Sequence, residues 1–339
     1  MEAKVSKKLA DTAKGKTLKM LEQHRGDIVS GEKLAGEIGV SRAAIWKAVE
    51  SLRKEGYVIS AVTNKGYILA EDSDILSAQG MCQFIDEEKY PYGEKYIHVH
   101  KILESTNKTA KEEAFSGAPH GTIIIAEEQT NGRGRMERSF FSPAKGLYMS
   151  FILRPTFNVS KSLLVTAAVS VAVCRAIKTV SDKETHIKWV NDIFLDGKKI
   201  CGILTEAITN FESGKIEAII IGIGINCNLE EKDMPEDIRE SAGSLSGLVS
   251  RNRLAAEILN ELTYILDDFK EDTRPEYMDE YRKRSMILRK DIKVYKNIAS
   301  GEYQDAKAVD ISDEGGLIVI YSNGMKDTLT TGEISIRLS

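Results

Sequence analysis

The amino-acid sequence predicts an α+β protein built from three consecutive domains. The chain has 339 residues, more than one hydrophobic core usually organises, and 42% of them are hydrophobic. Its beginning reads as short capped helices followed by a hairpin, its middle as strands alternating with helices, and its end as short strands only. We place the domains at residues 1–72, 73–284 and 285–339.

Composition limits the class of protein. Charged residues make up 29% of the chain, which is ordinary for a globular protein. The longest apolar stretch, residues 163–174, is interrupted by Thr and Ser, so we expect neither a membrane span nor a membrane partner. The first 16 residues lack the apolar segment of a signal peptide, and the four cysteines form no C-x-x-C pair. We therefore expect a cytoplasmic protein with reduced thiols.

The N-terminal domain is basic although the whole chain is acidic. Residues 1–72 hold 13 Lys and Arg against 10 Asp and Glu, whereas the net charge of the chain is −4. This asymmetry favours an anionic partner at the N-terminal end.

The same domain has the pattern of a winged helix-turn-helix. Apolar residues repeat at helical spacing in residues 16–25. Ser30 is placed to cap a second helix, and Gly39 to end it, because glycine adopts left-handed backbone angles at little cost. Ser41 is placed to cap a third helix with apolar residues at spacings of three and four. Two strand patterns joined by Thr-Asn-Lys-Gly then predict a hairpin, the wing.

We expect the third helix and the wing to bind DNA, because they offer polar and basic side chains to base edges and phosphates. These residues are Ser41, Arg42, Lys47, Arg53, Asn64 and Lys65. The alternative is a module that packs against a protein partner with its basic residues solvated. Trp46 is expected in the core or at a domain contact. Since one winged helix seldom binds tightly alone, we expect a homodimer on two-fold-related operator DNA.

The central segment predicts a mixed-sheet α/β domain. Strand patterns occupy residues 93–103, 121–130, 146–155, 185–207 and 216–228, and helix patterns about 74–84 and 161–180. Ser105 is placed to cap a helix, where it, Thr106 and Asn107 meet unpaired backbone N–H groups. The three side chains either bind a small polar group, such as an amide, urea or carboxylate, or only cap the helix.

A loop that mixes glycine with arginine follows a buried strand. Residues 127–143 read EEQTNGRGRMERSFFSP. Gly132 and Gly134 give the backbone the freedom to wrap around an anion. The guanidinium groups of Arg133, Arg135 and Arg138 are permanently charged, and their planar shape suits phosphate or carboxylate. Their mutual repulsion predicts a loop that a phosphate-bearing ligand orders. The alternative is a nucleic-acid contact of the RGG kind, or a loop without function.

Lys188 favours the first of these interpretations. It opens Lys-Trp-Val-Asn-Asp in an apolar sheet region, where an unpaired ammonium group would be costly. A buried lysine beside an arginine loop predicts a polyphosphate pocket and stabilisation of a transferring α-phosphate. Gly222 and Gly224 let a group approach the backbone, but Cys227 occupies the third glycine position of a G-x-G-x-x-G motif, and no G-x-x-x-x-G-K-[ST] motif occurs.

The C-terminal part ends in strands. Residues 251–269 form an amphipathic helix pattern, and a second helix is expected to end near Tyr281. Five short strand patterns follow Leu288, with hairpin signals at Gly315–Gly316 and Asn323–Gly324. They predict a small SH3-like β-barrel.

The motifs ESTN, EEQTNGRGR, KWVND, GIL and GIGIN, in this order and spacing, resemble the biotin–protein ligase family. With the winged helix in front, the chain resembles the bifunctional members, which also repress biotin genes. The resemblance covers essentially the whole chain. It implies that ATP activates biotin to biotinyl-5′-AMP, and that biotin is then transferred to a lysine of a biotin carboxyl carrier protein of acetyl-CoA carboxylase. It further implies Mg²⁺, with ligands that the sequence does not assign, a homodimer when the adenylate is bound, and a barrel beside the active site.

The resemblance assigns roles to individual residues. Lys188 and Arg135 would be catalytic, with Lys188 bridging the biotin carboxylate and the α-phosphate. Biotin would be bound by Ser105, Thr106, Asn107, Gln129, Gly132, Arg133, Gly134, Arg135 and Lys188. The nucleotide would be bound by Arg135, Arg138, Trp189, Asn191 and Asn226. Sheet edges around residues 196–206 would form the dimer.

Two departures from the family pattern leave alternatives open. Met136 and Glu137 stand where the commonest pattern, G-R-G-R-R-G-R, has Arg and Gly, and Val190 stands where K-W-P-N-D has Pro. Glu137 lowers the positive charge of the loop, which would weaken or slow its closure. One alternative is therefore a repressor that only senses biotin. Another is a lipoate ligase, against which the missing R-R-x-S-G-G-G run and the winged helix both count.

Overall fold

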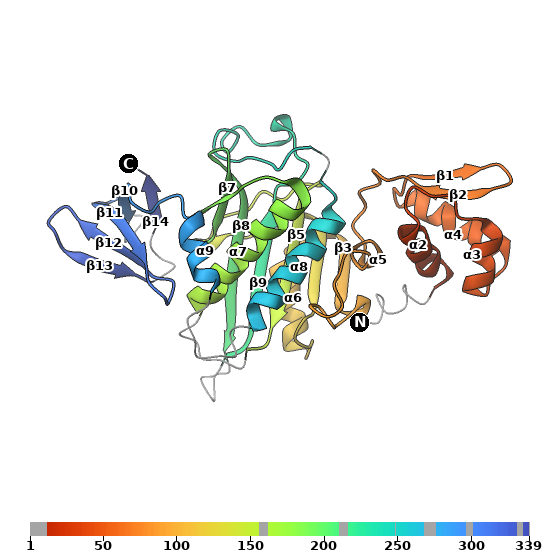
Figure 1. The fold of residues 1–339 in the computed structure, drawn as a ribbon, viewed down its shortest axis with the longest axis horizontal. Helices are drawn as coiled ribbons and strands as arrows, with labels where there is room; N and C mark the ends of the chain where they lie inside the picture. Colours follow the sequence, from red (N-terminus) through yellow and green to blue (C-terminus); the bar gives the residue numbers. More distant parts are fainter. Residues whose placement is uncertain are drawn as a thin grey trace.

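A computed structural model describes residues 12–155, 162–209, 216–247, 249–267, 276–295, 301–330 and 335–338 of the chain. Three regions follow one another along the long axis of the molecule (Figure 1). A helical region with a hairpin lies at one end, a seven-stranded sheet with its helices in the middle, and a five-stranded sheet at the other end. Most of the N-terminal segment that bears on a signal peptide lies outside the described residues.

The first region is the predicted winged helix-turn-helix. Its elements are α2 (Ala13–Gln23), α3 (Gly31–Ile38), α4 (Arg42–Lys54), β1 (Ile59–Val62) and β2 (Gly66–Leu69). The predicted caps are confirmed: the hydroxyls of Ser30 and Ser41 accept from the backbone N–H groups of Lys33 and Ala44. Gly39 ends α3 with φ of 76°. The region has a hydrophobic core of its own, which agrees with the caps and turn residues in specifying the same elements.

The segment between the first two regions departs from the prediction. Instead of a helix over residues 74–84, only α5 (Ala78–Met81) forms. Asp74 instead accepts hydrogen bonds from the backbone and side chain of Arg251, and Asn252 bonds the backbone of Ile75 and Ser77. These side chains satisfy backbone groups that a helix would otherwise pair, so the chain stays extended there. The result is a polar attachment of the linker to the start of α8.

The central sheet is mixed, as predicted. Its strands are β3 (Ile97–Leu103), β4 (Ile123–Gln129), β5 (Leu147–Leu153), β6 (His186–Lys188), β7 (Asp192–Leu195), β8 (Lys198–Thr209) and β9 (Ile216–Ile225). Their order is β3-β4-β5-β9-β8-β7-β6, in which only the β3–β4 pair is parallel. The predicted turn at Asp196–Gly197 joins β7 to β8, with positive φ at both residues.

Helices cover both faces of this sheet. α7 (Ser162–Ser181) and α8 (Arg251–Asp267) lie over one face, and α6 (Thr106–Phe115) packs on the other. Successive residues of a strand point to opposite faces of the sheet. Ile123 and Ile125 therefore belong to the hydrophobic core under α7 and α8, and Ile124 belongs to the core under α6. α7 is long and apolar enough to cross a membrane, but 72% of its apolar window is buried in the protein. It is a core helix.

The C-terminal sheet packs onto the central region through α9 (Tyr277–Arg284). Its strands are β10 (Asp291–Tyr295), β11 (Gln304–Ile311), β12 (Leu317–Tyr321), β13 (Lys326–Leu329) and β14 (Ser335–Leu338), in the order β13-β12-β11-β10-β14. All the pairs are antiparallel, with the predicted glycine turns between β11, β12 and β13. Buried residues of this sheet, such as Ile292 and Val319, belong to the same hydrophobic cluster as the central domain. The sheet is therefore fastened to the central sheet by a continuous core.

Candidate active site

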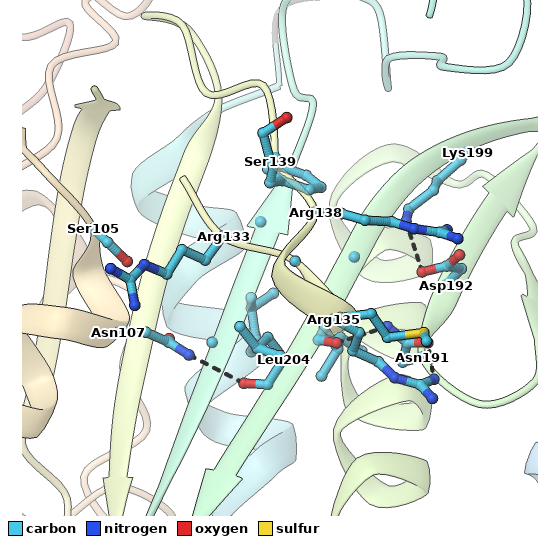
Figure 2. Close-up of a pocket in the computed structure, with 18 of the residues that line it drawn as sticks. Ser105, Asn107, Arg133, Arg135, Arg138, Ser139, Asn191, Asp192, Lys199 and Leu204 are labelled. Atoms are coloured by element: carbon cyan, nitrogen blue, oxygen red, sulfur yellow. Dashed lines mark hydrogen bonds and ion pairs between the residues drawn. The ribbon is translucent and has the colours of Figure 1, made fainter. Parts of the chain in front are cut away.

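A cavity of about 210 Å³ lies where the loop after β4 crosses the middle of β8 and the end of β9 (Figure 2). It is lined by Ser105, Thr106, Asn107, Gln129, Arg133, Gly134, Arg135, Met136, Arg138, Ser139, Phe140, Lys188, Trp189, Asn191, Asp192, Lys199, Gly202, Ile203, Leu204, Gly222, Ile223 and Gly224. The start of α6, the glycine–arginine loop and the turn between β6 and β7 thus meet at one place.

The start of α6 forms a polar end of the cavity. Ser105 occupies the cap position, but its hydroxyl makes no capping bond. Gln129 serves instead: its side-chain oxygen accepts from the backbone N–H of Thr106 at 2.8 Å and from the Thr106 hydroxyl at 3.1 Å. Its amide nitrogen donates to the Ser142 hydroxyl at 2.9 Å. The cap that the sequence assigned to Ser105 is therefore supplied by a distant residue, and the Ser105 side chain remains at the cavity wall.

Three protein groups form hydrogen bonds with the side chain of Asn107. Its amide nitrogen donates to the carbonyl of Leu204 at 3.3 Å and to the Glu206 carboxylate at 2.8 Å. The Ser150 hydroxyl donates to its side-chain oxygen at 2.6 Å. Both amide hydrogens are used, so Asn107 can offer a ligand only its second oxygen lone pair. Gly222 makes room for it, because a Cβ there would lie 2.1 Å from the Asn107 oxygen.

The glycine–arginine loop is folded by hydrogen bonds of its own. The N–H of Gly134 donates to the carbonyl of Arg138 at 2.7 Å, and that of Phe140 to Gly132 at 2.9 Å. A short 3₁₀ turn (Arg135–Glu137) lies between them, with Met136 in left-handed backbone at φ 57°. The lack of a side chain at Gly132 lets Ser142 and Phe140 approach it closely. Ordering of this loop by a bound ligand stays a prediction.

The arginines of the loop differ in their surroundings. Arg135 reaches across the cavity and donates to the side-chain oxygen of Asn191 at 2.8 Å. Burial lowers the pKa of its guanidinium, which nevertheless stays protonated at neutral pH. Arg133 and Arg138 are exposed, and Arg133 lies 3.9 Å from the Glu104 carboxylate. One arginine is therefore fixed in place, and two remain at the cavity mouth.

Lys188 ends β6 at the cavity and is half-buried, less buried than predicted, with its ammonium group 5.9 Å from the centre of the Phe194 ring. Lys199 also lines the cavity and pairs with Asp192 at 2.7 Å. With the three arginines, five cationic side chains surround the cavity, and Asp192 alone among the described lining residues carries a carboxylate. This excess of positive charge makes the site suited to a polyanion.

An aromatic ring lies between the polar and cationic ends. A Cβ at Gly224 would come within 2.6 Å of the Phe140 ring, and one at Gly202 within 3.1 Å. The glycines therefore form a flat floor on which this ring rests. The arrangement can accept a molecule with a polar head at α6, an apolar middle against Phe140, and anionic groups beside Lys188 and Arg135.

Comparison with known proteins identifies this arrangement. Residues 99–226 match the sequence model of the biotin/lipoate A/B protein ligase family, and residues 15–68 match that of an HTH domain. The bifunctional ligase/repressor BirA of Bacillus subtilis is 40% identical over 239 residues, which cover 70% of this chain and 72% of that protein. The BirA of Escherichia coli K12 is 28% identical and matches 92% of this chain and 94% of its own length. The chain belongs to the bifunctional biotin ligase/repressor family.

Structural comparison gives the same family. The biotin protein ligase of Aquifex aeolicus, solved in complex with biotin and ATP, superposes with a TM-score of 0.61 at 27% identity. The match covers 72% of this chain and 99% of that one. The chain is thus a biotin–protein ligase that also carries the DNA-binding domain of a repressor.

Within this ligase/repressor, two of the residues assigned to ligands lie outside the cavity. Gly132 packs inside the glycine–arginine loop, against Ser142 and Phe140. Asn226 follows β9, and its amide donates to the carbonyl of Gly243 at 2.8 Å, so it holds the segment after β9. Each belongs to a short motif with several members that line the cavity, such as Gly134 and Gly224, so the motif alone did not separate lining from non-lining residues.

Several lining residues were not predicted to bind a ligand. They are Met136, Ser139, Phe140, Asp192, Lys199, Gly202, Ile203, Leu204 and Ile223. All except Lys199 lie within the KWVND, GIL or GIGIN motif or in the glycine–arginine loop, so their position in the sequence was a signal. Lys199 had none, because its place at the site depends on how β8 packs against β7.

Five of the six residues predicted to bind DNA are exposed, and their contact with DNA stays a prediction. Ser41, Arg42 and Lys47 are exposed on α4, and Asn64 and Lys65 are exposed in the wing. The sixth, Arg53, is half-buried: its guanidinium donates to the carbonyl of Ile59 at 2.8 Å and to Glu50 at 2.6 Å, so it joins α4 to β1. Trp46, expected in the core or at a domain contact, is not in the core, because it is 55% exposed on α4.

Proposed function

We propose that the cavity holds biotin and ATP side by side, forms biotinyl-5′-AMP, and passes biotin to a lysine of a carrier protein. The proposal rests on how the lining side chains change along the cavity. They are polar and uncharged at Thr106 and Gln129, and cationic at Arg135 and Lys188. A urea-like head group fits the first end, and a carboxylate beside a phosphate fits the second. The complex of the Aquifex aeolicus relative contains both biotin and ATP.

In the first step, a carboxylate oxygen of biotin attacks the α-phosphorus of ATP. A new O–P bond forms, the bond from the α-phosphorus to the oxygen that bridges the α- and β-phosphorus atoms breaks, and pyrophosphate leaves. Negative charge gathers on the α-phosphate oxygens in the transition state, so a fixed cation stabilises it more than it stabilises the substrates. Lys188 supplies that cation between the carboxylate and the phosphate, and Arg135, fixed by Asn191, supplies a second.

In the second step, the lysine amine of the acceptor attacks the acyl carbon of the adenylate. The C–N bond forms, the C–O bond to AMP breaks, and the amine loses a proton. The role proposed for this chain's residues is positional: Ser105, Thr106 and Gln129 hold the head group while Phe140 packs along the apolar chain.

The other proposed ligand contacts are assigned from where each residue lies in the cavity lining. Gly134 and Arg133 cover the cavity mouth over biotin, and Asn107 contributes its remaining lone pair. Arg138, Trp189 and Asn191 lie at the nucleotide end. The Trp189 indole N–H donates to the carbonyl of Gly315 at 3.0 Å, which ties this end of the cavity to the C-terminal sheet. We place the domain boundaries at residues 72/73 and 284/285.

The described lining of the site offers one carboxylate, that of Asp192, to a Mg²⁺ ion. Among the described residues, no group of three or more His, Cys, Asp and Glu could enclose a metal. Mg²⁺ that accompanies nucleotides needs only one or two carboxylates, with phosphates and water completing its shell. Asp192, at present paired with Lys199, would hold it and has the required chemistry. When bound, the ion would neutralise charge on the leaving pyrophosphate.

The acceptor, the dimer and the cellular location are parts of the same proposal. A relative from Mycobacterium tuberculosis is named as a biotin–[acetyl-CoA-carboxylase] ligase, which supports a biotin carboxyl carrier protein as the acceptor. Residues 198–202 of β8 already pair with β7, whereas residues 204–209 have no strand beside them other than β9 among those described. We therefore move the proposed dimer edge from 196–206 to 204–209. A cytoplasmic location fits both substrates.

Transfer of labelled biotin tests the proposal. The full-length chain is incubated with ATP, MgCl₂, radiolabelled biotin and a biotin carboxyl carrier domain, and label on the carrier is counted. ATP-dependent labelling supports the ligase. Biotin binding without labelling would support the repressor that only senses biotin, and labelling by lipoate but not by biotin would support a lipoate ligase.

A further inference from the structure

Trp46 is exposed on the recognition helix with no described part of the chain to cover it. Its side chain is 55% exposed, and Ala43, one turn earlier on the same face, is exposed as well. The opposite face of α4, with Ile45 and Val49, is buried against the rest of the domain. An indole is among the largest apolar surfaces that a side chain offers, and leaving it in water is unfavourable. A partner that covers Trp46 would gain this energy.

The charges around Trp46 select the partner. Arg42 lies four residues before it and Lys47 directly after it, and both are exposed. The first turn of α4 holds no acidic residue, and Glu50, the next acid along the helix, is paired with Arg53. An apolar strip between two exposed cations fits a polyanion that also presents apolar groups. Duplex DNA is such a partner, because thymine methyl groups lie in its major groove between the phosphate strands.

Position within the helix favours contact with bases. Trp46 is the fifth residue of α4, which begins at Arg42, and the first turns of a recognition helix are those that reach base edges. Thymine presents a methyl group and an oxygen acceptor side by side in the major groove. The indole matches this pair, since its ring is apolar and its single polar group is an N–H donor.

We infer that Trp46 reads a thymine in the operator, with its ring against the C5 methyl group and its N–H toward the O4 acceptor. Trp46 is then a specificity-determining residue of the repressor, in addition to the polar residues of α4. The inference rests on the DNA-binding role of the N-terminal domain, and not on the ligase reaction.

The first part of the test finds the DNA site. The full-length chain, with biotin, ATP and MgCl₂, selects duplexes from a random library, and the recovered motif is sequenced. Each thymine of the motif is then replaced by uracil, which removes only the methyl group, and Kd is measured by fluorescence anisotropy. For wild type we expect one thymine in each half-site at which uracil weakens binding about fourfold, the equivalent of one buried methyl group at ~0.8 kcal/mol.

Variants then identify the reader of that thymine. With Trp46→Ala, the uracil effect at this position should fall below about 1.5-fold, whereas Trp46→Phe should keep it because the ring remains. Val58→Ala is the matched control, since Val58 is 52% exposed in the same domain but lies off α4. It should keep the full uracil effect. Because the N-terminal domain has a core of its own, its thermal unfolding is measured directly, and an unchanged transition for Trp46→Ala verifies that the variant is folded. Transfer of labelled biotin by Trp46→Ala should also equal that by wild type.

Three results would overturn the inference. One is an undiminished uracil effect in Trp46→Ala. Another is equal weakening of selected and random DNA by Trp46→Ala, which would make Trp46 a contact to the backbone. The third is a change in sedimentation of Trp46→Ala without DNA, which would make it a contact between protomers. A wild-type chain that selects no motif would refute the DNA-binding role as well, so the two failures are distinguishable.

Discussion

The guanidinium of Arg135 donates a hydrogen bond of 2.8 Å to the side-chain oxygen of Asn191, across the cavity. The amide nitrogen of Asn191 in turn donates to the carbonyl of Ile203 on β8 at 2.8 Å. The glycine–arginine loop is therefore attached to the central sheet through one asparagine. This attachment fixes one cation at the cavity that Lys188 also lines. In the proposed reaction, such a preorganised cation stabilises charge that develops in the transition state.

Asn191→Ala should release Arg135 from its position. A hydrogen bond to a charged group contributes about 1.5–3 kcal/mol, so kcat/KM for adenylate formation should fall roughly tenfold or more. Pyrophosphate release from biotin and ATP measures this. Asn323→Ala, in a turn of the C-terminal sheet far from the cavity, is the control. Equal rates for Asn191→Ala and wild type would show that Arg135 acts without this anchor.

Gly222→Ala should damage the biotin end of the cavity. The new Cβ would lie 2.1 Å from the side-chain oxygen of Asn107, which Ser150, Leu204 and Glu206 hold in place. Overpacking of this kind costs about 1–3 kcal/mol, so we expect a lower Tm and a KM for biotin raised several-fold. Gly36→Ala on α3, with no atom within 4 Å of its Cβ, should do neither. A Gly222→Ala protein with normal Tm and KM would contradict the described packing.

Glu206 acts through Asn107 and does not line the cavity. It accepts from the Asn107 amide at 2.8 Å and from the Lys111 ammonium group at 2.6 Å. Glu206→Ala should raise KM for biotin about three- to tenfold, the effect of one hydrogen bond of 0.5–1.5 kcal/mol, and leave kcat unchanged. Glu206→Gln should restore most of the affinity. A fall in kcat at unchanged KM would place Glu206 in the chemistry instead.

The His98–Glu113 pair predicts a pH-dependent contribution to stability. Burial lowers the pKa of His98, but the hydrogen bond and charge of Glu113, 3.0 Å away, raise it more, so the net shift is upward from 6.5. A raised folded-state pKa means that the pair stabilises fully below about pH 6.5 and that this stability is lost as pH rises through the folded value. Tm measured from pH 5.5 to 8.5 should decline more steeply for wild type than for Glu113→Gln. Parallel curves would refute this.

The helix caps and tight turns could be predicted from the sequence, because they depend on residues close together in the chain. Ser30, Gly39 and Ser41 cap and end the helices of the winged domain as expected, because a cap involves only residues within a few positions along the chain. The paired glycine turns of the C-terminal sheet follow from the same kind of short-range constraint. The motifs of the central domain marked one region, since most of their members line one cavity.

Residues that depend on tertiary packing were beyond the sequence. Gln129 caps α6 from a strand 23 residues away, so Ser105 was assigned a bond that it does not make. The expected helix over residues 74–84 was prevented by Arg251 and Asn252, which bond the linker from 177 residues further along the chain. Trp46 was expected in the core or at a domain contact, and only the packing of α4 shows that it lies outside the core.

The central claim is that Lys188 stabilises the transferring α-phosphate. Formation of labelled biotinyl-5′-AMP from biotin and ATP, in single-turnover conditions and without a carrier protein, tests it most directly. Lys188→Ala should reduce the rate on the order of 10²- to 10³-fold, the usual effect of removing one preorganised group from the transition state, while biotin still binds. Lys199→Ala, which removes a second cavity cation already paired with Asp192, should reduce it far less. A Lys188→Ala protein that forms the adenylate at nearly the wild-type rate would contradict the account.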